Sequence, residues 1–258
     1  MHYRGAVRWI TASVDLPPDR TDIGVAFWRA VTSTALSSRR GEREEFVTLL
    51  PPDGDAYLRV QTVAQREQTA RVHLDLHVDD THTMTRHAAA LGAMVACTRG
   101  DLVVLTSPGG LPFCICAHDG AAVRPPPLRV DAGHHSLVDQ VCIDIPPRSW
   151  PHECGFWRDL TGWEVRPGSR PEFRYLARPA GMPLRLLLQR LDADPDGGRV
   201  RAHLDLACSD VDAEVARHRR LGARIVAVQT SWVVMVDPAG AHYCITGRDP
   251  TTGTTADA

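Results

Sequence analysis

The sequence predicts an α+β fold of four βαβββ modules, which form two tandem domains with curved mixed sheets and helices on their outer faces. An internal repeat is the first observation behind this prediction: RVHLDL at 71–76 returns as RAHLDL at 201–206. The copies align at an offset of 130, since Arg71 matches Arg201, and they need no gap as far as Asp119 and Asp249. Roughly a third of these positions are identical, which indicates duplication of one structural unit.

The alternation of apolar and polar residues within the repeated stretch is the second observation. Leu74 and Leu76 would face one side of a strand, while His73 and Asp75 face the other. This pattern is typical of a curved sheet with helices on its apolar face and a polar hollow on its inner face. We therefore look for the functional site on the side of His73 and Asp75.

Each half follows the order strand, helix and three strands twice. Asp79 or Asp80 fits the N-cap of the second helix, and Gly92 fits the left-handed position after it. The segments SPGG at 107–110 and DPAG at 237–240 are predicted to be structural turns. Predicted helices lie at about 21–35, from the cap at Asp79 or Asp80 to 91–92, and around Phe156-Trp157. Predicted strands lie at 7–16, 45–50, 57–63, 71–76, 93–97, 102–106, 113–116, 138–145, 173–176, 184–191 and 201–206.

A proline-rich segment separates the two halves. Pro125-Pro126-Pro127 makes it stiff and extended. We predict a first domain at 1–118, a linker at 119–136, a second domain at 137–249 and a frayed tail at 250–258.

Composition narrows the classes of function. The 258 residues are 43% hydrophobic and 23% charged, as in a globular protein, and the net charge of −2 gives no reason to expect nucleic acid or an anionic membrane as partner. All 29 basic residues are Arg, so that Schiff-base catalysis and a Walker-type phosphate loop are excluded. The runs at 39–40 and 217–220 are interpreted as solvated surface.

Cysteine usage and hydropathy indicate the cellular compartment of the protein. The seven Cys are scattered and show no CxxC motif, which favours reduced thiols. No run approaches the roughly 20 apolar residues of a membrane span, and no signal core follows Met1. We expect a cytoplasmic protein that works on a small molecule as a monomer or homodimer.

Four sequence features carry a resemblance to a known family. They are Phe-Trp at 27–28 and 156–157, Leu-Gln at 188–189, Arg-x-His-Leu-Asp-Leu, and the Asp-Pro-x-Gly turn before the last strand. With the βαβββ order, this pattern resembles the vicinal oxygen chelate superfamily, the group of glyoxalases, bleomycin-resistance proteins and extradiol dioxygenases, and most closely its bacterial glyoxalase-like branch. The resemblance covers nearly the whole chain and implies two tandem glyoxalase-like domains.

The resemblance also implies positions for metal ligands. They fall on Thr11, Gln61, His73 and Cys114 in the first half and on Gln140, Gln189, His203 and Cys244 in the second. Cys stands where the metal enzymes of the family carry Glu, and each set retains one His. Amides bind borderline ions poorly, so we expect no metal cofactor. If zinc, iron, nickel or manganese is bound, we expect it in the second half, on His203, Gln140, Gln189 and Cys244.

Two interpretations of the His-Asp pairs remain open. His73 and His203 either pair with Asp75 and Asp205 to satisfy a cavity wall, or contact a ligand directly. An Asp beside a His also raises the basicity of the ring, so these four residues are the catalytic candidates, as general bases. The ligand-binding candidates are Gln61, His73, Asp75, Gln140, Gln189, His203 and Asp205.

Two classes of function follow. The first is a metal-independent protein that binds a hydrophobic or aromatic metabolite or antibiotic in the concave sheet cavity. The second is a metal-dependent or His/Asp-based lyase, isomerase or dioxygenase. The missing carboxylates at Cys114 and Cys244 favour the first.

Overall fold

The computed structural model describes residues 6–64, 70–130 and 133–254. The elements before the linker are β1 (Val7–Leu16), α1 (Thr21–Thr32), β2 (Ala35–Leu36), β3 (Phe46–Leu50), β4 (Leu58–Thr62), β5 (Arg71–Val78), α2 (Thr81–Ala90), β6 (Met94–Arg99), β7 (Leu102–Thr106) and β8 (Pro112–Ala117). The remaining elements are β9 (Leu128–Arg129), β10 (His135–Ile145), α3 (Trp150–Thr161), β11 (Val165–Pro167), β12 (Phe173–Leu176), β13 (Arg185–Arg190), η1 (Pro195–Gly198), β14 (Arg201–Cys208), α4 (Val211–Arg220), β15 (Arg224–Val228), β16 (Trp232–Val236) and β17 (His242–Thr246).

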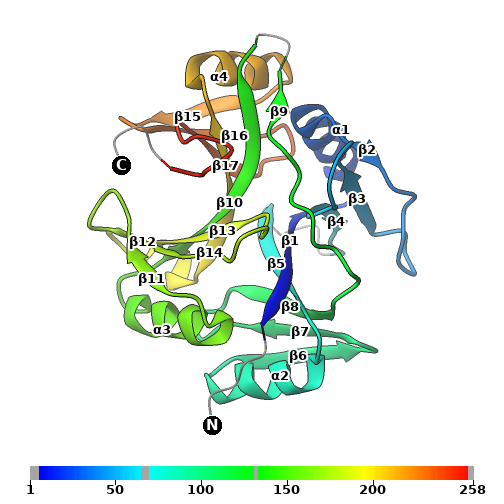
Figure 1. The fold of residues 1–258 in the computed structure, drawn as a ribbon, viewed down its shortest axis with the longest axis vertical. Helices are drawn as coiled ribbons and strands as arrows, with labels where there is room; N and C mark the ends of the chain where they lie inside the picture. Colours follow the sequence, from blue (N-terminus) through cyan, green and yellow to red (C-terminus); the bar gives the residue numbers. More distant parts are fainter. Residues whose placement is uncertain (1–5, 65–69, 131–132, 255–258) are drawn as a thin grey trace. The chain divides into compact units, whose positions relative to one another are not determined.

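The strands form two mixed sheets (Figure 1). Within the described residues the first has eight strands in the order β2-β3-β4-β1-β5-β8-β7-β6. The second has nine, since the order β11-β12-β13-β10-β14-β17-β16-β15 is extended by β9 beside β10. The pairs β5·β8 and β14·β17 are parallel, whereas β3·β4, β7·β8, β12·β13 and β16·β17 are antiparallel. The predicted α+β class with two tandem βαβββ pairs is confirmed.

Three short strands and one helix end differ from the predictions. The sequence does not indicate β2, β9 or β11, because strands of two or three residues carry too little alternation to be recognised. The predicted helix 21–35 ends at Thr32, where Ser33 takes a left-handed conformation with φ of 49°. The predicted N-cap is confirmed, since Asp80 Oδ1 accepts a hydrogen bond from Thr83 N at 2.9 Å.

By its internal contacts the chain divides into two compact units. Unit 1 comprises the described parts of 1–12, 73–123 and 141–202, and unit 2 those of 13–72, 124–140 and 203–258. Each unit therefore draws on both halves of the sequence. The predicted domain boundaries at 118 and 137 remain a prediction.

The core of unit 1 gathers aromatic rings of α3 around β8. Phe113 lies edge-on to both Phe156 and Trp157, with ring centroids 5.8 and 5.4 Å apart. Trp157 Nε1 donates to Glu153 at 2.8 Å, and Glu153 also accepts from the backbone N of Gly109 in the SPGG turn. The predicted turn thus docks on a helix through a buried carboxylate.

In unit 2 a Trp and a carboxylate likewise hold a turn against a helix. Trp28 Nε1 donates to Asp237 Oδ2 at 2.9 Å, and Asp237 Oδ1 accepts from the backbone N of Ala239 and Ala241 at 2.8 Å each. The Phe-Trp pairs belong to the cores, since Trp28 and Trp157 are 1% and 0% exposed. The predicted DPAG turn is confirmed by the hydrogen bond from Gly240 N to the Asp237 carbonyl at 3.0 Å.

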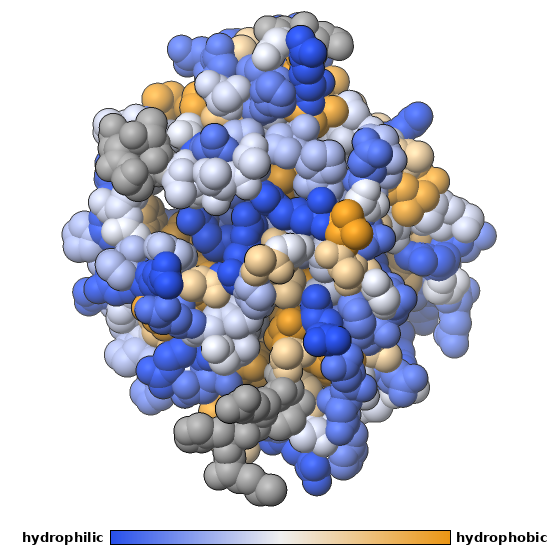
Figure 2. All heavy atoms as spheres, viewed as in Figure 1, coloured by the Kyte–Doolittle hydropathy of each residue, from blue (hydrophilic) through white to orange (hydrophobic). Residues whose placement is uncertain are grey.

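The surface and the helices are consistent with apolar side chains being buried in the cores. On the face shown in Figure 2, hydrophilic residues predominate and hydrophobic residues show as small patches. Among the described residues, no helix is long and apolar enough to cross a membrane.

Candidate functional site

The polar face of β5 is buried like its apolar face. His73, Asp75 and His77 are 7%, 4% and 3% exposed, so the predicted polar hollow is wrong in one respect: the polar side chains are themselves covered. They tolerate burial because they contact polar partners. Thr11 Oγ1 lies 3.0 Å from His77 Nε2, and His73 Nε2 lies 3.3 Å from Asp75 Oδ1.

Three donors of different chemistry meet at this face of unit 1. The parallel register of β5 and β8 sets Asp75 opposite Cys114. One ligand atom each from His73, Asp75 and Cys114 lies within 4.8 Å of the others. Burial raises the pKa of the Cys114 thiol, and the hydrogen bond with His73 opposes this only in part. Cys114 is therefore a protonated thiol near neutral pH.

The equivalent residues of β14 lie together in unit 2. His203 Nε2 is 3.3 Å from Asp205 Oδ1 and 3.5 Å from Cys244 Sγ. Gln140 Nε2 donates to Asp205 Oδ2, whereas Thr11, its counterpart in the first half, contacts His77. Burial alone would raise the pKa of Asp205, but the hydrogen bond and charge of His203 outweigh it, so that the pKa is lowered.

The other predicted site residues lie as follows. Gln189 on β13 contacts Cys142, with 3.3 Å between Oε1 and Sγ. Gln61 is half-buried on β4, where it pairs with Phe46 in register. The described contacts thus gather His73, Asp75 and Cys114 in one unit, and Gln140, His203, Asp205 and Cys244 in the other. The pairing of each His with the Asp two residues on is confirmed.

The donor set His73, Asp75 and Cys114 fits a borderline divalent cation. Imidazole, carboxylate and thiolate are the side chains that bind zinc, and three protein ligands leave a fourth position for water or substrate. The iron sites of non-haem oxygenases use two His and one carboxylate. The group in unit 1 contains a single imidazole, so it matches zinc better than iron.

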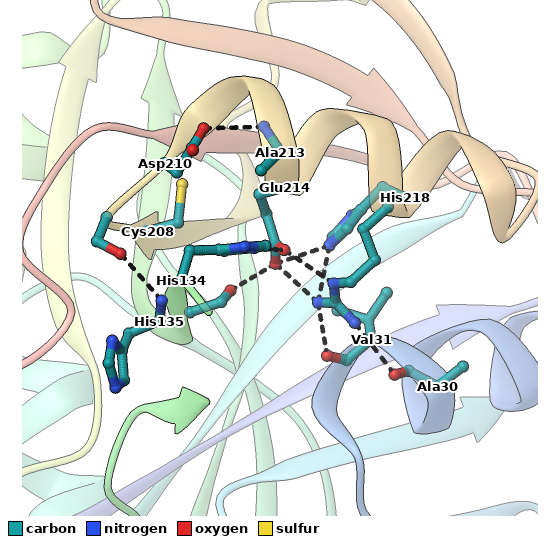
Figure 3. Close-up of polar contacts among 12 residues, drawn as sticks. Ala30, Val31, His134, His135, Cys208, Asp210, Ala213, Glu214 and His218 are labelled. Carbon is teal, nitrogen blue, oxygen red and sulfur yellow. Dashed lines mark hydrogen bonds and ion pairs between the residues drawn. The ribbon is translucent and has the colours of Figure 1, made fainter. Parts of the chain in front are cut away.

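A second buried cluster of His and carboxylate lies in unit 2 and was not predicted (Figure 3). Glu214 on α4 is fully buried and accepts hydrogen bonds from His134 Nε2 at 2.7 Å and Ser136 Oγ at 2.6 Å. His218 Nε2 lies 3.1 Å from Glu214 Oε1, and its Nδ1 lies 2.8 Å from the Tyr243 hydroxyl.

Arg217 neutralises this cluster. Its Nε and Nη2 donate to the two oxygens of Glu214 at 2.8 and 2.7 Å, and Nη2 also reaches the carbonyl of Val31 at the end of α1 at 2.9 Å. Burial alone would raise the pKa of Glu214, but the hydrogen bonds from Arg217 and His218 outweigh it and hold the pKa far below its usual range. Burial lowers the pKa of His218, and the hydrogen bond to Glu214 opposes this without cancelling it.

The interpretation of the run at 217–220 as solvated surface is therefore wrong for Arg217 and His218, and it holds for Arg219 and Arg220. The internal repeat contains the signal that would have shown this. Aligned with Glu214, His218 and Tyr243 in the first copy are Met84, Ala88 and Phe113, all fully buried. A charged residue that replaces a core residue at the same repeat position needs a buried partner.

The comparison with protein families decides the classification. The family model described as Glyoxalase-like domain matches residues 14–116 and 140–246. The chain belongs to this family. The predicted membership of the vicinal oxygen chelate superfamily is confirmed by this match and by the fold. A comparison with curated proteins finds no match.

Solved structures share the fold of this glyoxalase-like protein at low identity. A 2,2',3-trihydroxybiphenyl 1,2-dioxygenase from Sphingomonas wittichii strain RW1 is 13% identical with a TM-score of 0.60, over 94% of this chain and 90% of that one. The 2,3-dioxygenase LapB from Pseudomonas sp. KL28 is 14% identical with a TM-score of 0.60, over 94% and 92%.

A third similar structure is much longer than this chain. It is a xylose isomerase-like TIM barrel/4-hydroxyphenylpyruvate dioxygenase fusion protein, 12% identical with a TM-score of 0.60 over 95% of this chain. This chain spans about half of it, 49% of its length. At such identities the likeness shows the common fold alone.

Proposed function

We propose that this glyoxalase-like protein is a metal-dependent enzyme that binds a divalent cation, zinc by preference, through His73, Asp75 and Cys114. The observation that carries the proposal is the convergence of these three donors within 4.8 Å. We place the metal in the first half because these three donors belong to one compact unit, and the proposal replaces the expectation of a metal-free protein. The sequence hypothesis counted neither Asp75 nor Asp205 as a donor. It favoured the second half because that set carries two amides, where the first half has Thr11 and Gln61.

The chemistry of the donor set supports a lyase or isomerase over a dioxygenase. Bound zinc would supply a Lewis acid that polarises an oxygen of the substrate without redox change. His73 would provide the neutral nitrogen ligand, and Asp75 a carboxylate ligand already 3.3 Å from it. The Cys114 thiol would release its proton on metal binding, which makes the affinity depend on pH.

The substrate we propose is a small molecule with an oxygen function able to reach the cation. The dioxygenase names belong to the similar structures, whose low identity carries only the fold to this chain. We retain as proposals a monomeric or homodimeric state and a cytoplasmic location.

The alternative is a metal-independent small-molecule-binding protein. One observation favours it: His73 Nε2 and Asp75 Oδ1 already lie 3.3 Å apart, and burial raises the pKa of the Cys114 thiol. In that case His73 and Asp75 serve as polar contacts for a ligand, as do His203 and Asp205.

Zinc binding separates the two proposals. Protein stripped of metal is titrated with zinc by calorimetry, as wild type and as His73→Ala, His203→Ala and His242→Ala. We expect His73→Ala to lose one equivalent of zinc that the exposed control His242→Ala retains, while His203→Ala reports separately on the second half. Equal zinc stoichiometry in wild type and His73→Ala would overturn the metal site and leave the binding protein.

A further inference from the structure

A partly open cavity of about 300 Å³ lies in unit 2 and contains none of the His-Asp residues discussed above. Its walls come from the end of α1, the β3–β4 turn, the proline-rich segment before β9, and the start of β10. Leu49, Tyr57, Pro125 and Leu137 are buried residues of this lining. The cavity therefore involves the linker, which neither proposed function uses.

The size of the cavity exceeds that of a packing defect. Protein interiors are close-packed, with few voids larger than one water molecule. An apolar cavity of about 150 Å³ in another protein takes up benzene, and small-molecule sites begin at about 300 Å³. A void of about 300 Å³ in this chain is thus large enough for a molecule of one or two rings.

The polar groups of the lining define the chemistry of the occupant. The Tyr57 hydroxyl donates to the carbonyl of Val138 at 2.8 Å, and the Thr32 hydroxyl to that of Trp28 at 2.6 Å. Ser136 Oγ donates to Glu214 at 2.6 Å. These hydroxyl protons are committed within the protein, so an occupant gains most of its binding energy from apolar contact.

The prolines keep the cavity preformed. Pro51 and Pro52 face it from the β3–β4 turn, and Pro125, Pro126 and Pro127 from the linker. Each proline ring fixes its own backbone φ, so these walls lose little entropy when a ligand binds. Proline rings and aromatic rings are also complementary surfaces in peptide recognition.

Charge is confined to exposed residues of the lining. Asp53 and Arg129 line the cavity and are exposed, whereas its apolar residues Leu49 and Leu137 are buried. An occupant can therefore place one polar substituent near these two side chains. A fully charged or highly polar molecule would lose hydration without compensation in the apolar interior.

We propose that this cavity is a second small-molecule site, for a neutral, mainly apolar compound with one or two aromatic rings. It is independent of the metal site, because none of its lining residues belongs to the His73 group. The Pro125–Pro127 segment is then a wall of a binding site as well as a connection between halves.

Indole is a suitable probe, because it is bicyclic, neutral and soluble at millimolar concentration. ¹⁵N-labelled protein is titrated with indole and followed by NMR, as wild type, Leu128→Trp and Val123→Trp. Leu128 is half-buried in the lining, so its replacement by Trp fills the cavity, whereas Val123 is an exposed residue of the same linker and serves as the control.

We expect saturable shifts at the amides of Val31, Tyr57 and Leu206, all of which line the cavity. The affinity should fall at least about tenfold in Leu128→Trp, because the added ring occupies the ligand's volume, and stay unchanged in Val123→Trp. Pro127→Phe, also in the lining, replaces Leu128→Trp if the latter does not fold. Absence of saturable binding, or binding that the filling variants leave intact, would overturn the proposal; His73→Ala should not affect it.

Discussion

Two buried clusters of imidazole and carboxylate in this protein differ in what else touches the carboxylate. At Glu214, Arg217 supplies a guanidinium to both oxygens, and two imidazoles and a hydroxyl complete the contacts. At Asp75, the neighbouring donors are an imidazole and a thiol, both of which are metal ligands. A His beside a carboxylate therefore forms a structural cluster when an Arg side chain supplies the positive charge. It is a candidate metal site when the neighbouring side chains are metal ligands.

The structural role of the Glu214 cluster is tested most strongly by removing the charge of Glu214. Glu214→Gln leaves Arg217 near the end of α1 without its counter-ion, and we expect the free energy of unfolding to fall by about 3–5 kcal/mol. Urea denaturation measures the change. Asp212→Asn, at an exposed position of the same helix, is the control and should change stability by less than about 0.5 kcal/mol.

Restoring the first copy's residues sharpens this test. The triple variant Glu214→Met, Arg217→His, His218→Ala carries the side chains found at 84, 87 and 88. Because apolar packing can replace a buried ion pair at little cost, it should be more stable than Glu214→Gln. A triple variant less stable than the single one would mean that the cluster does more than neutralise buried charge.

Acid should act on the Glu214 cluster in two steps. The folded-state pKa of His218 lies below its ordinary 6.5, so the unfolded chain binds a proton first and stability falls as pH drops below about 6.5. The pKa of Glu214 lies far below its ordinary 4.5, so its contribution is present above that pH and is lost as the pH falls further.

Urea midpoints between pH 8 and pH 4 measure this dependence, which we expect to be weaker than the effect of Glu214→Gln. The double variant Glu214→Met, His218→Ala supplies the control, since it lacks both titrating groups and adds none. If its stability falls with acid as steeply as that of the wild type, other groups cause the loss.

The fold was predictable because the chain repeats itself and its strands alternate. The pairing of His73 with Asp75 was predictable as well, since both project from one face of one strand. The approach of Cys114 to that pair depends on the parallel register of β5 and β8, which residue spacing does not contain. The family resemblance identified Cys114 as a metal-ligand position, but it did not include Asp75 among the ligands.

The Glu214 cluster could not be recognised from local pattern. Its members come from α4, β17 and the segment around β10, and Glu214 and Arg217 on a helix look like an ordinary surface pair. The cavity at Pro125 was hidden for a similar reason, because a proline run indicates stiffness and says nothing of what it encloses.

The most direct test of the metal site uses cobalt in place of zinc. Cobalt bound to a thiolate absorbs through sulfur-to-metal charge transfer, so the spectrum reports whether Cys114 is a ligand. We expect metal-free wild-type protein to develop this band on addition of one equivalent of cobalt, Cys114→Ser to lose it, and Cys97→Ser, at an exposed thiol, to keep it. No charge-transfer band in the wild type, or an equal band in Cys114→Ser, would contradict the assignment of His73, Asp75 and Cys114 as the metal site.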